Sequence, residues 1–194
     1  MPNLYIIGGC NGAGKTTAAY TVLPEMLNCR EFVNADEIAR GISPFQPERV
    51  SFQAGRIMLN RIKELIEEGV DFAFETTLST KSYTTVIKTA LSKGYKVTLI
   101  FFWLESPELA KERVKFRVAN GGHNIPDDII VRRYFRGLKN FFTLYLRLTH
   151  TWLVYDNSAS LPELIARGED DDFVVINNDI WKRLSHEHTV SGSK

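Results

Sequence analysis

The eight residues GCNGAGKT, at positions 9–16, are the most informative stretch of this chain. They match the pattern G-x-x-x-x-G-K-[ST], with an apolar run over 4–8 before them and a helical pattern over 15–27 after them. Glycines let successive backbone N–H groups turn inward around a polyphosphate, and the start of the following helix attracts anions. We therefore predict a phosphate-binding P-loop rather than a chance glycine-rich turn.

The predicted P-loop gives its polar groups distinct roles with ATP and Mg²⁺. Lys15 is expected to bridge the β- and γ-phosphates as a point charge, and the Thr16 hydroxyl to ligate Mg²⁺. The residues expected to bind the nucleotide in this segment are Gly9, Asn11, Gly12, Ala13, Gly14, Lys15, Thr16 and Thr17.

Composition limits the classes of protein to which the chain can belong. The 194 residues include 24 Lys and Arg against 23 Asp and Glu, so neither a globally basic nucleic-acid binder nor an acidic tail protein is expected. Two cysteines are too few for a disulfide framework or a four-cysteine zinc site. The N-terminus lacks the basic region of a signal peptide, and the longest apolar stretch, 97–104, is too short to span a bilayer. We expect a soluble, cytoplasmic protein with no membrane partner.

Short apolar runs alternate with amphipathic stretches along the chain, which favours βαβ units and a parallel sheet. The expected strands are 4–8, 31–34, 72–75, 96–104, 152–155 and 173–176. The expected helices are 15–27, 48–68 with Gly69 as its C-terminal cap, 81–93, 106–119 and 126–148. The predicted fold is an α/β P-loop NTPase, a three-layer α/β/α sandwich with a mostly parallel sheet of five or six strands.

A P-loop predicts nucleotide binding, and the rest of the sequence narrows the class. The sequence contains no N-K-x-D motif of GTPases and no L-S-G-G-Q-like signature of transporter ATPases. The size and an arginine-bearing segment suit a small-molecule kinase that transfers the γ-phosphoryl group to a hydroxyl acceptor. We expect one kinase domain over 1–184, a small helical lid at roughly 113–133 within it, and a polar tail over 185–194.

Two acids follow predicted strands at the edge of the sheet where ligands bind in doubly wound folds. Asp36, in NADE (34–37), can take the proton of the acceptor hydroxyl, or it can cap the following turn. Glu75, in FETT (74–77), can hold a water on Mg²⁺ or bind substrate hydroxyls, and Thr76 and Thr77 add donors. The alternative for Glu75 is an acid at the sheet edge with a polar cap behind it.

Arginines gather in the segment expected to form the lid. Arg113 and Arg117 lie four residues apart on one predicted helix and so share a face. A second group, on the helix after the glycines at 121–122, comprises Arg132, Arg133 and Arg136. Facing arginines can close over ATP and neutralise developing charge, although a solvated basic face is the alternative. Sequence does not decide which of the later arginines points inward.

The segment YDNS, at 155–158, follows a late predicted strand. In a P-loop topology this loop lies near the purine, so Asn157 is expected to contact adenine. A simple Asx-turn explains the same residues nearly as well.

The order of these segments resembles that of the zeta-toxin-like group of P-loop kinases. The resemblance covers roughly residues 4–160 and rests on GGCNGAGKTT (8–17), NADE (34–37), FETTLS (74–79) and ERVKFRVANGGH (112–123). It implies phosphorylation of the sugar 3′-hydroxyl of UDP-N-acetylglucosamine by ATP·Mg²⁺, and a small antitoxin protein that blocks the nucleotide site. The chain has little added length for a large sugar-nucleotide site, so the kinase chemistry carries over better than the acceptor.

Carried over residue by residue, the resemblance assigns further roles. Asp36 resembles the catalytic base of the family, and Glu75 and Thr77 resemble its sugar-site residues. Arg113 resembles an arginine that stabilises the transferred phosphoryl group, and Arg117 is the best match to a second lid arginine.

Two other functions compete with a small-molecule kinase. One is a P-loop ATPase that uses nucleotide to regulate binding of a partner and has no acceptor. The other is a nucleic-acid end kinase, although the near-zero net charge and the lack of an aromatic and basic stripe count against nucleic acid.

Overall fold

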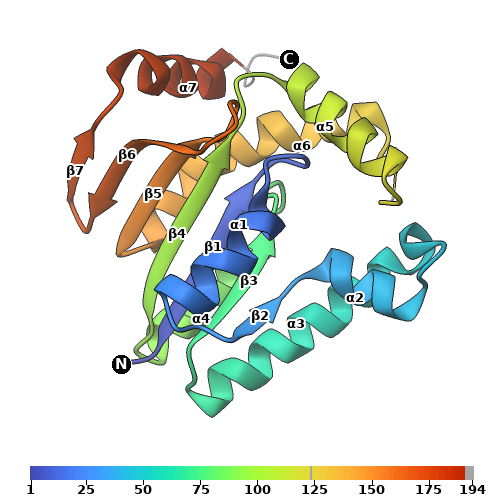
Figure 1. Ribbon diagram of the computed structural model, residues 1–194. Helices are drawn as coiled ribbons and strands as arrows, with labels where there is room; N and C mark the ends of the chain where they lie inside the picture. The colour runs from blue at the N-terminus through green and yellow to red at the C-terminus, as the bar shows by residue number, and fades with distance from the viewer. Residues whose placement is uncertain (123, 191–194) are drawn as a thin grey trace.

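Parallel strands form the centre of the molecule, as the apolar runs predicted. The computed structural model describes residues 1–122 and 124–190, so His123 and the end of the expected tail, 191–194, lie outside the described residues. Within them the strands form one seven-stranded sheet in the order β2-β3-β1-β4-β5-β6-β7 (Figure 1). Their bounds are β1 Asn3–Gly9, β2 Glu31–Val33, β3 Phe72–Thr76, β4 Lys96–Trp103, β5 Thr151–Asp156, β6 Glu163–Glu169 and β7 Asp172–Val175. Strands β1 to β5 pair with one another in parallel. Strand β6 is antiparallel to both of its neighbours, β5 and β7.

Helices cover both faces of this sheet, with α1 in front of it and α6 behind it in Figure 1. The helices are α1 Lys15–Thr21, α2 Ala35–Ile42, α3 Ser51–Glu68, α4 Tyr83–Ser92, α5 Pro107–Ala119, α6 Asp127–Asn140 and α7 Asn178–Val190. The three-layer α/β/α architecture of P-loop NTPases is therefore confirmed. Among the described residues, every helix falls short of the length and hydrophobicity that a membrane span requires.

The core lies around β1 and β4, where a parallel strand is covered on both faces. Leu4 and Ile6 of β1 and Val97 and Leu99 of β4 are fully buried, and Ile6 stands level with Leu99 across the ladder. Such strands must be apolar on both faces, which explains the near-continuous hydrophobic run from Lys96.

Local signals at two helix ends were read correctly. The Ser106 hydroxyl accepts a hydrogen bond from the backbone N–H of Leu109 at 3.1 Å, and Pro107 begins α5. Gly69 caps α3 in the left-handed conformation, with φ of 69°. These signals are local, so they need no tertiary information.

The structure differs from expectation at α2, a helix that the sequence analysis did not predict. Its cap is Asn34, whose side-chain oxygen accepts hydrogen bonds from the backbone N–H groups of Asp36 at 2.8 Å and Glu37 at 3.4 Å. Asp36 is therefore not the cap. It lies in the first turn of α2.

The sheet has seven strands, whereas five or six were expected. The additional strand is β6, which the sequence pattern did not predict. Its sequence, ELIARGE, lacks a regular alternation, and Gly168 is required because a Cβ there would lie 2.4 Å from the ring of Trp152. Helix α7 also extends to Val190, into the stretch expected to be a polar tail. Leu184 of α7 is fully buried.

Candidate active site

The P-loop adopts the backbone that its glycines predict. Gly9, Gly12 and Gly14 have φ of 142°, 81° and 79°. Neighbouring elements also press closely on the loop: a Cβ on Gly9 would lie 2.3 Å from the carbonyl oxygen of Phe102, and one on Gly12 would lie 2.8 Å from that of Ala110. Glycine is therefore required here both by conformation and by space.

Lys15 lies inside the loop rather than on the surface, with 6% of its area exposed. Its ammonium donates to the carbonyl oxygen of Cys10 at 2.9 Å and lies 3.3 Å from Oε1 of Glu75. A buried ammonium needs such an anionic partner. A polyphosphate entering the loop can take over this role from Glu75.

Glu75 connects the P-loop to the end of the neighbouring strand. Its Oε2 accepts hydrogen bonds from the Thr16 hydroxyl at 2.7 Å and from the Asn34 side chain at 2.9 Å. The sheet register brings these groups together, because β1 and β3 are parallel neighbours and Ile7 stands level with Glu75. Asn34 is a member of this cluster that the sequence pattern did not indicate.

The same cluster offers the donors that Mg²⁺ requires. The ion prefers oxygen ligands and is usually held by one or two protein groups together with phosphate oxygens and water. Thr16 and Glu75 supply a hydroxyl and a carboxylate side by side. Within residues 1–122 and 124–190, no group of three or more His, Cys, Asp or Glu side chains forms a metal cage. The residues present fit Mg²⁺ bound together with a nucleotide.

A cavity of about 250 Å³ opens over the P-loop, and we call it the phosphate cavity. Two arginines of α5, Arg113 and Arg117, line it together with Thr16, Thr17 and Asp36. Arg113 is fixed there by donation from Nη2 to the carbonyl oxygen of Ser158 at 2.9 Å. The structure therefore brings the predicted arginines to the predicted P-loop.

A second cavity, of about 290 Å³, shares Asn11, Lys15, Asp36 and Glu75 with the phosphate cavity, and we call it the acceptor cavity. Its hydroxyl groups come from the end of β3, the loop after it and the start of α4, and comprise Thr76, Thr77, Ser79, Thr80 and Tyr83. Asp36 and Glu75 line this cavity and the phosphate cavity alike. A molecule in the acceptor cavity would thus face both the phosphate cavity and a carboxylate.

The two threonines after Glu75 are already hydrogen-bonded within the protein. The Thr76 hydroxyl accepts from the backbone N–H of Leu78 at 3.1 Å, and the hydroxyls of Thr77 and Ser79 lie 2.8 Å apart. Leu78 has a positive φ of 55°, so the chain turns sharply at this point. Substrate binding by Thr76 and Thr77 stays a prediction.

Arg133 is the later arginine that points inward. Its Nη1 donates to the side-chain oxygen of Asn11 in the P-loop at 3.2 Å, and it lines the acceptor cavity. Burial lowers the pKa of the Arg133 guanidinium, and the charge of Asp36 acts in the opposite direction. A sequence signal existed, because Arg133 is three residues after Ile130 and four before Gly137, both on the buried face of α6.

Asn157 holds the P-loop from outside. Its side-chain N–H donates to the carbonyl oxygen of Ala13 at 2.8 Å, and a Cβ on Gly14 would lie 2.5 Å from its amide nitrogen. The Asx-turn at this loop is made by Asp156, whose Oδ1 accepts from the backbone N–H of Ser158 at 2.9 Å. The predicted contact of Asn157 with adenine stays a prediction.

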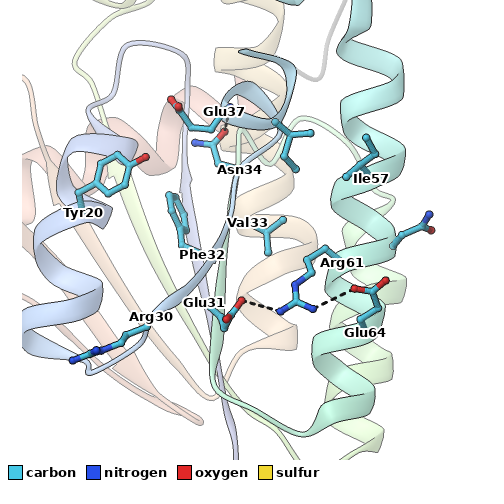
Figure 2. A pocket seen from close by; sticks show the side chains of 12 residues that line it. Tyr20, Arg30, Glu31, Phe32, Val33, Asn34, Glu37, Ile57, Arg61 and Glu64 are labelled. Atoms are coloured by element: carbon cyan, nitrogen blue, oxygen red, sulfur yellow. Dashed lines mark hydrogen bonds and ion pairs between the residues drawn. The ribbon is translucent and has the colours of Figure 1, made fainter. Parts of the chain in front are cut away.

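A larger cavity, of about 820 Å³, lies at the edge of the sheet between α1, β2 and α3 (Figure 2). Tyr20, Phe32 and Ile57 contribute apolar surface to it. The guanidinium of Arg61 is held by Glu31 at 3.1 Å and Glu64 at 3.2 Å. This cavity is formed beside an edge strand, and the P-loop does not line it.

Fold and site together define a P-loop kinase. The family model described as "Zeta toxin" matches residues 1–178, and the chain belongs to the zeta toxin family. An uncharacterised protein of Haemophilus influenzae is 32% identical over 126 residues, which cover 65% of this chain and 88% of that protein.

Solved structures share the fold at low sequence identity. A chain of the AvrRxo1-ORF1:-ORF2 complex with ATP has a TM-score of 0.76 and 16% identity, and the match covers 95% of this chain and 64% of that one. A chain of the PezAT toxin–antitoxin system of Streptococcus pneumoniae has a TM-score of 0.64 and 16% identity, with 100% and 88% covered. This chain therefore spans under two thirds of the AvrRxo1 complex chain that it matches.

Proposed function

We propose that this nucleotide-dependent kinase transfers the γ-phosphoryl group of ATP, bound with Mg²⁺, to a hydroxyl group of a small molecule. The observation that carries the proposal is the position of Asp36, which lines the phosphate cavity and the acceptor cavity at once. An acid shared by the two cavities can reach a hydroxyl on one side while the phosphate group lies on the other.

In this proposal the P-loop and Lys15 bind the phosphates. The ammonium of Lys15 then pairs with phosphate oxygens in place of the Glu75 carboxylate. Thr16 and Glu75 would hold Mg²⁺, which when bound supplies positive charge to the phosphate oxygens. Asp36 accepts the proton of the acceptor hydroxyl as its oxygen forms a bond to the γ-phosphorus, and ADP leaves as the bond to the β-phosphate oxygen breaks.

The arginines neutralise charge on the transferred group. Arg113 and Arg117 reach the phosphate cavity from α5, and Arg133 reaches the P-loop from α6. These three arginines lie in the segment of roughly 113–133, in α5 and α6. In this proposal that segment acts as a lid over the nucleotide. Preorganised guanidinium groups suit the delocalised charge of a phosphoryl group in transfer.

The finer assignments belong to the same proposal. The acceptor is a UDP-sugar such as UDP-N-acetylglucosamine, and the kinase acts in the cytoplasm. A small antitoxin protein restrains it, an assignment supported by family membership and by the toxin–antitoxin system among the structures with this fold.

The test is incubation of the purified protein with ATP·Mg²⁺, UDP-N-acetylglucosamine and a panel of other hydroxyl compounds, followed by mass spectrometry. Asp36→Asn is expected to lose about 10²–10⁴-fold in kcat while ATP affinity is nearly retained. Lys15→Ala should lose about 3–5 kcal/mol of transition-state stabilisation. The matched control is Glu37→Gln, because Glu37 adjoins Asp36 and pairs with Arg40 without lining either cavity.

The alternative outcomes each point to another function. Loss of ATP binding in Asp36→Asn would contradict the proposed role of Asp36 as the general base, because a base for the acceptor hydroxyl is not needed to bind ATP. Slow ATP hydrolysis with no acceptor in the panel would favour a nucleotide-dependent binding protein. Strongly salt-dependent affinity for oligonucleotides would favour an end kinase.

A further inference from the structure

Asn34 lies at the junction of β2 and α2 (Figure 2), and the proposed function gives it no role. It is a buried polar residue, with 6% of its area exposed. In the parallel pair of β2 and β3, Val33 stands level with Phe74. The residues that follow these two, Asn34 and Glu75, therefore come side by side. The sheet thus places a buried amide against the carboxylate that is proposed to hold Mg²⁺.

The two ends of the Asn34 amide have different partners. Its Oδ1 accepts hydrogen bonds from the backbone N–H groups of Asp36 at 2.8 Å and Glu37 at 3.4 Å. Its Nδ2 donates to Oε2 of Glu75 at 2.9 Å and lies 3.5 Å from Oγ1 of Thr16. The partners fix this orientation, because the flipped amide would put its oxygen against a carboxylate and its N–H₂ group against two N–H groups.

The carboxylate of Glu75 also divides its two oxygens between different partners. Oε1 pairs with the Lys15 ammonium at 3.3 Å, whereas Oε2 accepts from Thr16 and Asn34. In the proposed function the phosphates replace Glu75 as the partner of Lys15. Oε1 then loses its partner, and the hydrogen bond from Asn34 to Oε2 continues to hold the carboxylate beside the Thr16 hydroxyl.

Asparagine meets both demands at this position, whereas two other residues that cap helices equally well do not. An ionised aspartate donates no hydrogen bond and would put a second negative charge beside Glu75. The hydroxyl of a serine ends one bond short of the atom that donates to Glu75. The cap of α2 explains only the oxygen of the Asn34 amide, so its donor end points to a second role.

We infer that Asn34 is a positioning residue, which acts through Glu75 and Asp36. Its N–H₂ group fixes the Glu75 carboxylate at the proposed Mg²⁺ site, and its oxygen fixes the first turn of α2, which carries Asp36. One buried side chain thus sets the position of the proposed Mg²⁺ ligand relative to the proposed base. This inference rests on the proposed function for its effect on catalysis, but not for its effect on Mg²⁺ binding.

The first test measures Mg²⁺ binding and needs no acceptor. ADP is titrated into the protein by calorimetry at a series of Mg²⁺ concentrations, which gives the concentration that produces half of the gain in ADP affinity. Asn34→Ser keeps a cap and loses the donor, so this concentration is expected to rise about tenfold. A purely structural role would lower the fraction of protein that binds and leave the concentration unchanged. An unchanged concentration in folded Asn34→Ser overturns the inference.

Asn177 is the matched control, because it uses its side chain in the same way at the start of α7. Its Oδ1 accepts from the backbone N–H of Ile180 at 3.2 Å, and its Nδ2 donates to Oε1 of Glu163 at 3.3 Å. It lines neither the phosphate cavity nor the acceptor cavity. Asn177→Ser should therefore keep the Mg²⁺ dependence of the wild type. An equal change in Mg²⁺ dependence in Asn177→Ser and Asn34→Ser overturns the inference.

A measurement on the unaltered protein covers the case in which Asn34→Ser does not fold. The side-chain N–H₂ signals of Asn34 are followed by heteronuclear NMR as Mg²⁺ is added to the ADP-bound protein. They are expected to shift, because the amide donates to the carboxylate at the proposed Mg²⁺ site, whereas the signals of Asn177 should stay in place. Signals of Asn34 that Mg²⁺ leaves unchanged overturn the inference.

Asn34→Ala separates the two ends of the amide. This variant removes the cap as well as the donor, so kcat in the acceptor assay should fall further than in Asn34→Ser. The Mg²⁺ dependence should stay that of Asn34→Ser, because both variants lack the donor. Equal kcat in the two variants overturns the link from Asn34 to Asp36.

The two proposals can fail separately. A raised Mg²⁺ requirement in Asn34→Ser, with no phosphorylated product from any acceptor, removes the kinase proposal and keeps Asn34 as the residue that positions Glu75. Efficient phosphorylation of an acceptor, with the kcat and the Mg²⁺ dependence of the wild type in Asn34→Ser, keeps the kinase and removes the role of Asn34.

Discussion

Replacement of Glu75 by glutamine tests the charge cluster at the P-loop. The side chain of Glu75 is 10% exposed and that of Lys15 is 6% exposed, so their ion pair at 3.3 Å is shielded from water. In Glu75→Gln one of the two oxygens becomes an N–H₂ group. If the remaining oxygen keeps Thr16 and Asn34, the new donor faces the ammonium of Lys15. Removal of one partner from a buried pair costs about 3–5 kcal/mol, and we expect about 3 kcal/mol for the nucleotide-free protein.

The assay is urea unfolding at neutral pH, with and without saturating ATP. ATP phosphates give Lys15 a new partner, so at least half of the difference between variant and wild type should disappear with ATP. Glu64→Gln is the matched control, because Glu64 pairs with Arg61 at a similar 3.2 Å on the surface. It should cost no more than about 0.5 kcal/mol.

A double variant separates charge from packing. Lys15→Met with Glu75→Gln removes both charges, so it should be more stable than Glu75→Gln alone. The reasoning is refuted if Glu75→Gln costs less than about 1 kcal/mol, or if the double variant loses the sum of the two single effects.

Two further predictions concern packing and thiol reactivity. Gly137→Ala should lose about 2 kcal/mol of stability, because a Cβ there would lie 2.4 Å from the carbonyl oxygen of Thr77. Gly55→Ala has no atom within 4 Å of the added Cβ and should gain about 0.5–1 kcal/mol; equal thermal shifts for the two would contradict this. Burial raises the pKa of the Cys10 thiol to about 11, so it stays protonated near neutral pH and its alkylation should accelerate only as the pH approaches that value. Mass spectrometry of alkylated native protein checks this, and labelling at about pH 8 as fast as in the unfolded chain would speak against it.

Several features of the fold could be predicted because their causes are local. The P-loop needs only glycines with φ between 79° and 142° and a lysine at the start of a helix. Strand β4 is apolar on both faces because a central parallel strand is buried on both. The cap of α5 is contained in three consecutive residues from Ser106.

Other features were missed because the local pattern is weak or ambiguous. Helix α2 follows β2 directly, and its cap, Asn34, also fits the end of the predicted strand 31–34. Strand β6 has no regular alternation of apolar and polar residues. Its Gly168 is required because the ring of Trp152 on the neighbouring strand leaves no room for a side chain. The cap of α2 is local but ambiguous, because Asn34 also continues the strand pattern, whereas β6 depends on its contact with the neighbouring strand β5.

The P-loop, the acids that follow the strands and the arginines of the later helices are all evident from the amino-acid sequence alone. Which of these groups meet depends on how the chain folds. Thr16 and Glu75 lie 59 residues apart in the chain, and Asn11 and Arg133 lie 122 apart. Sheet order and helix packing join them, and these depend on the whole chain's burial of apolar surface rather than on any local pattern of residues.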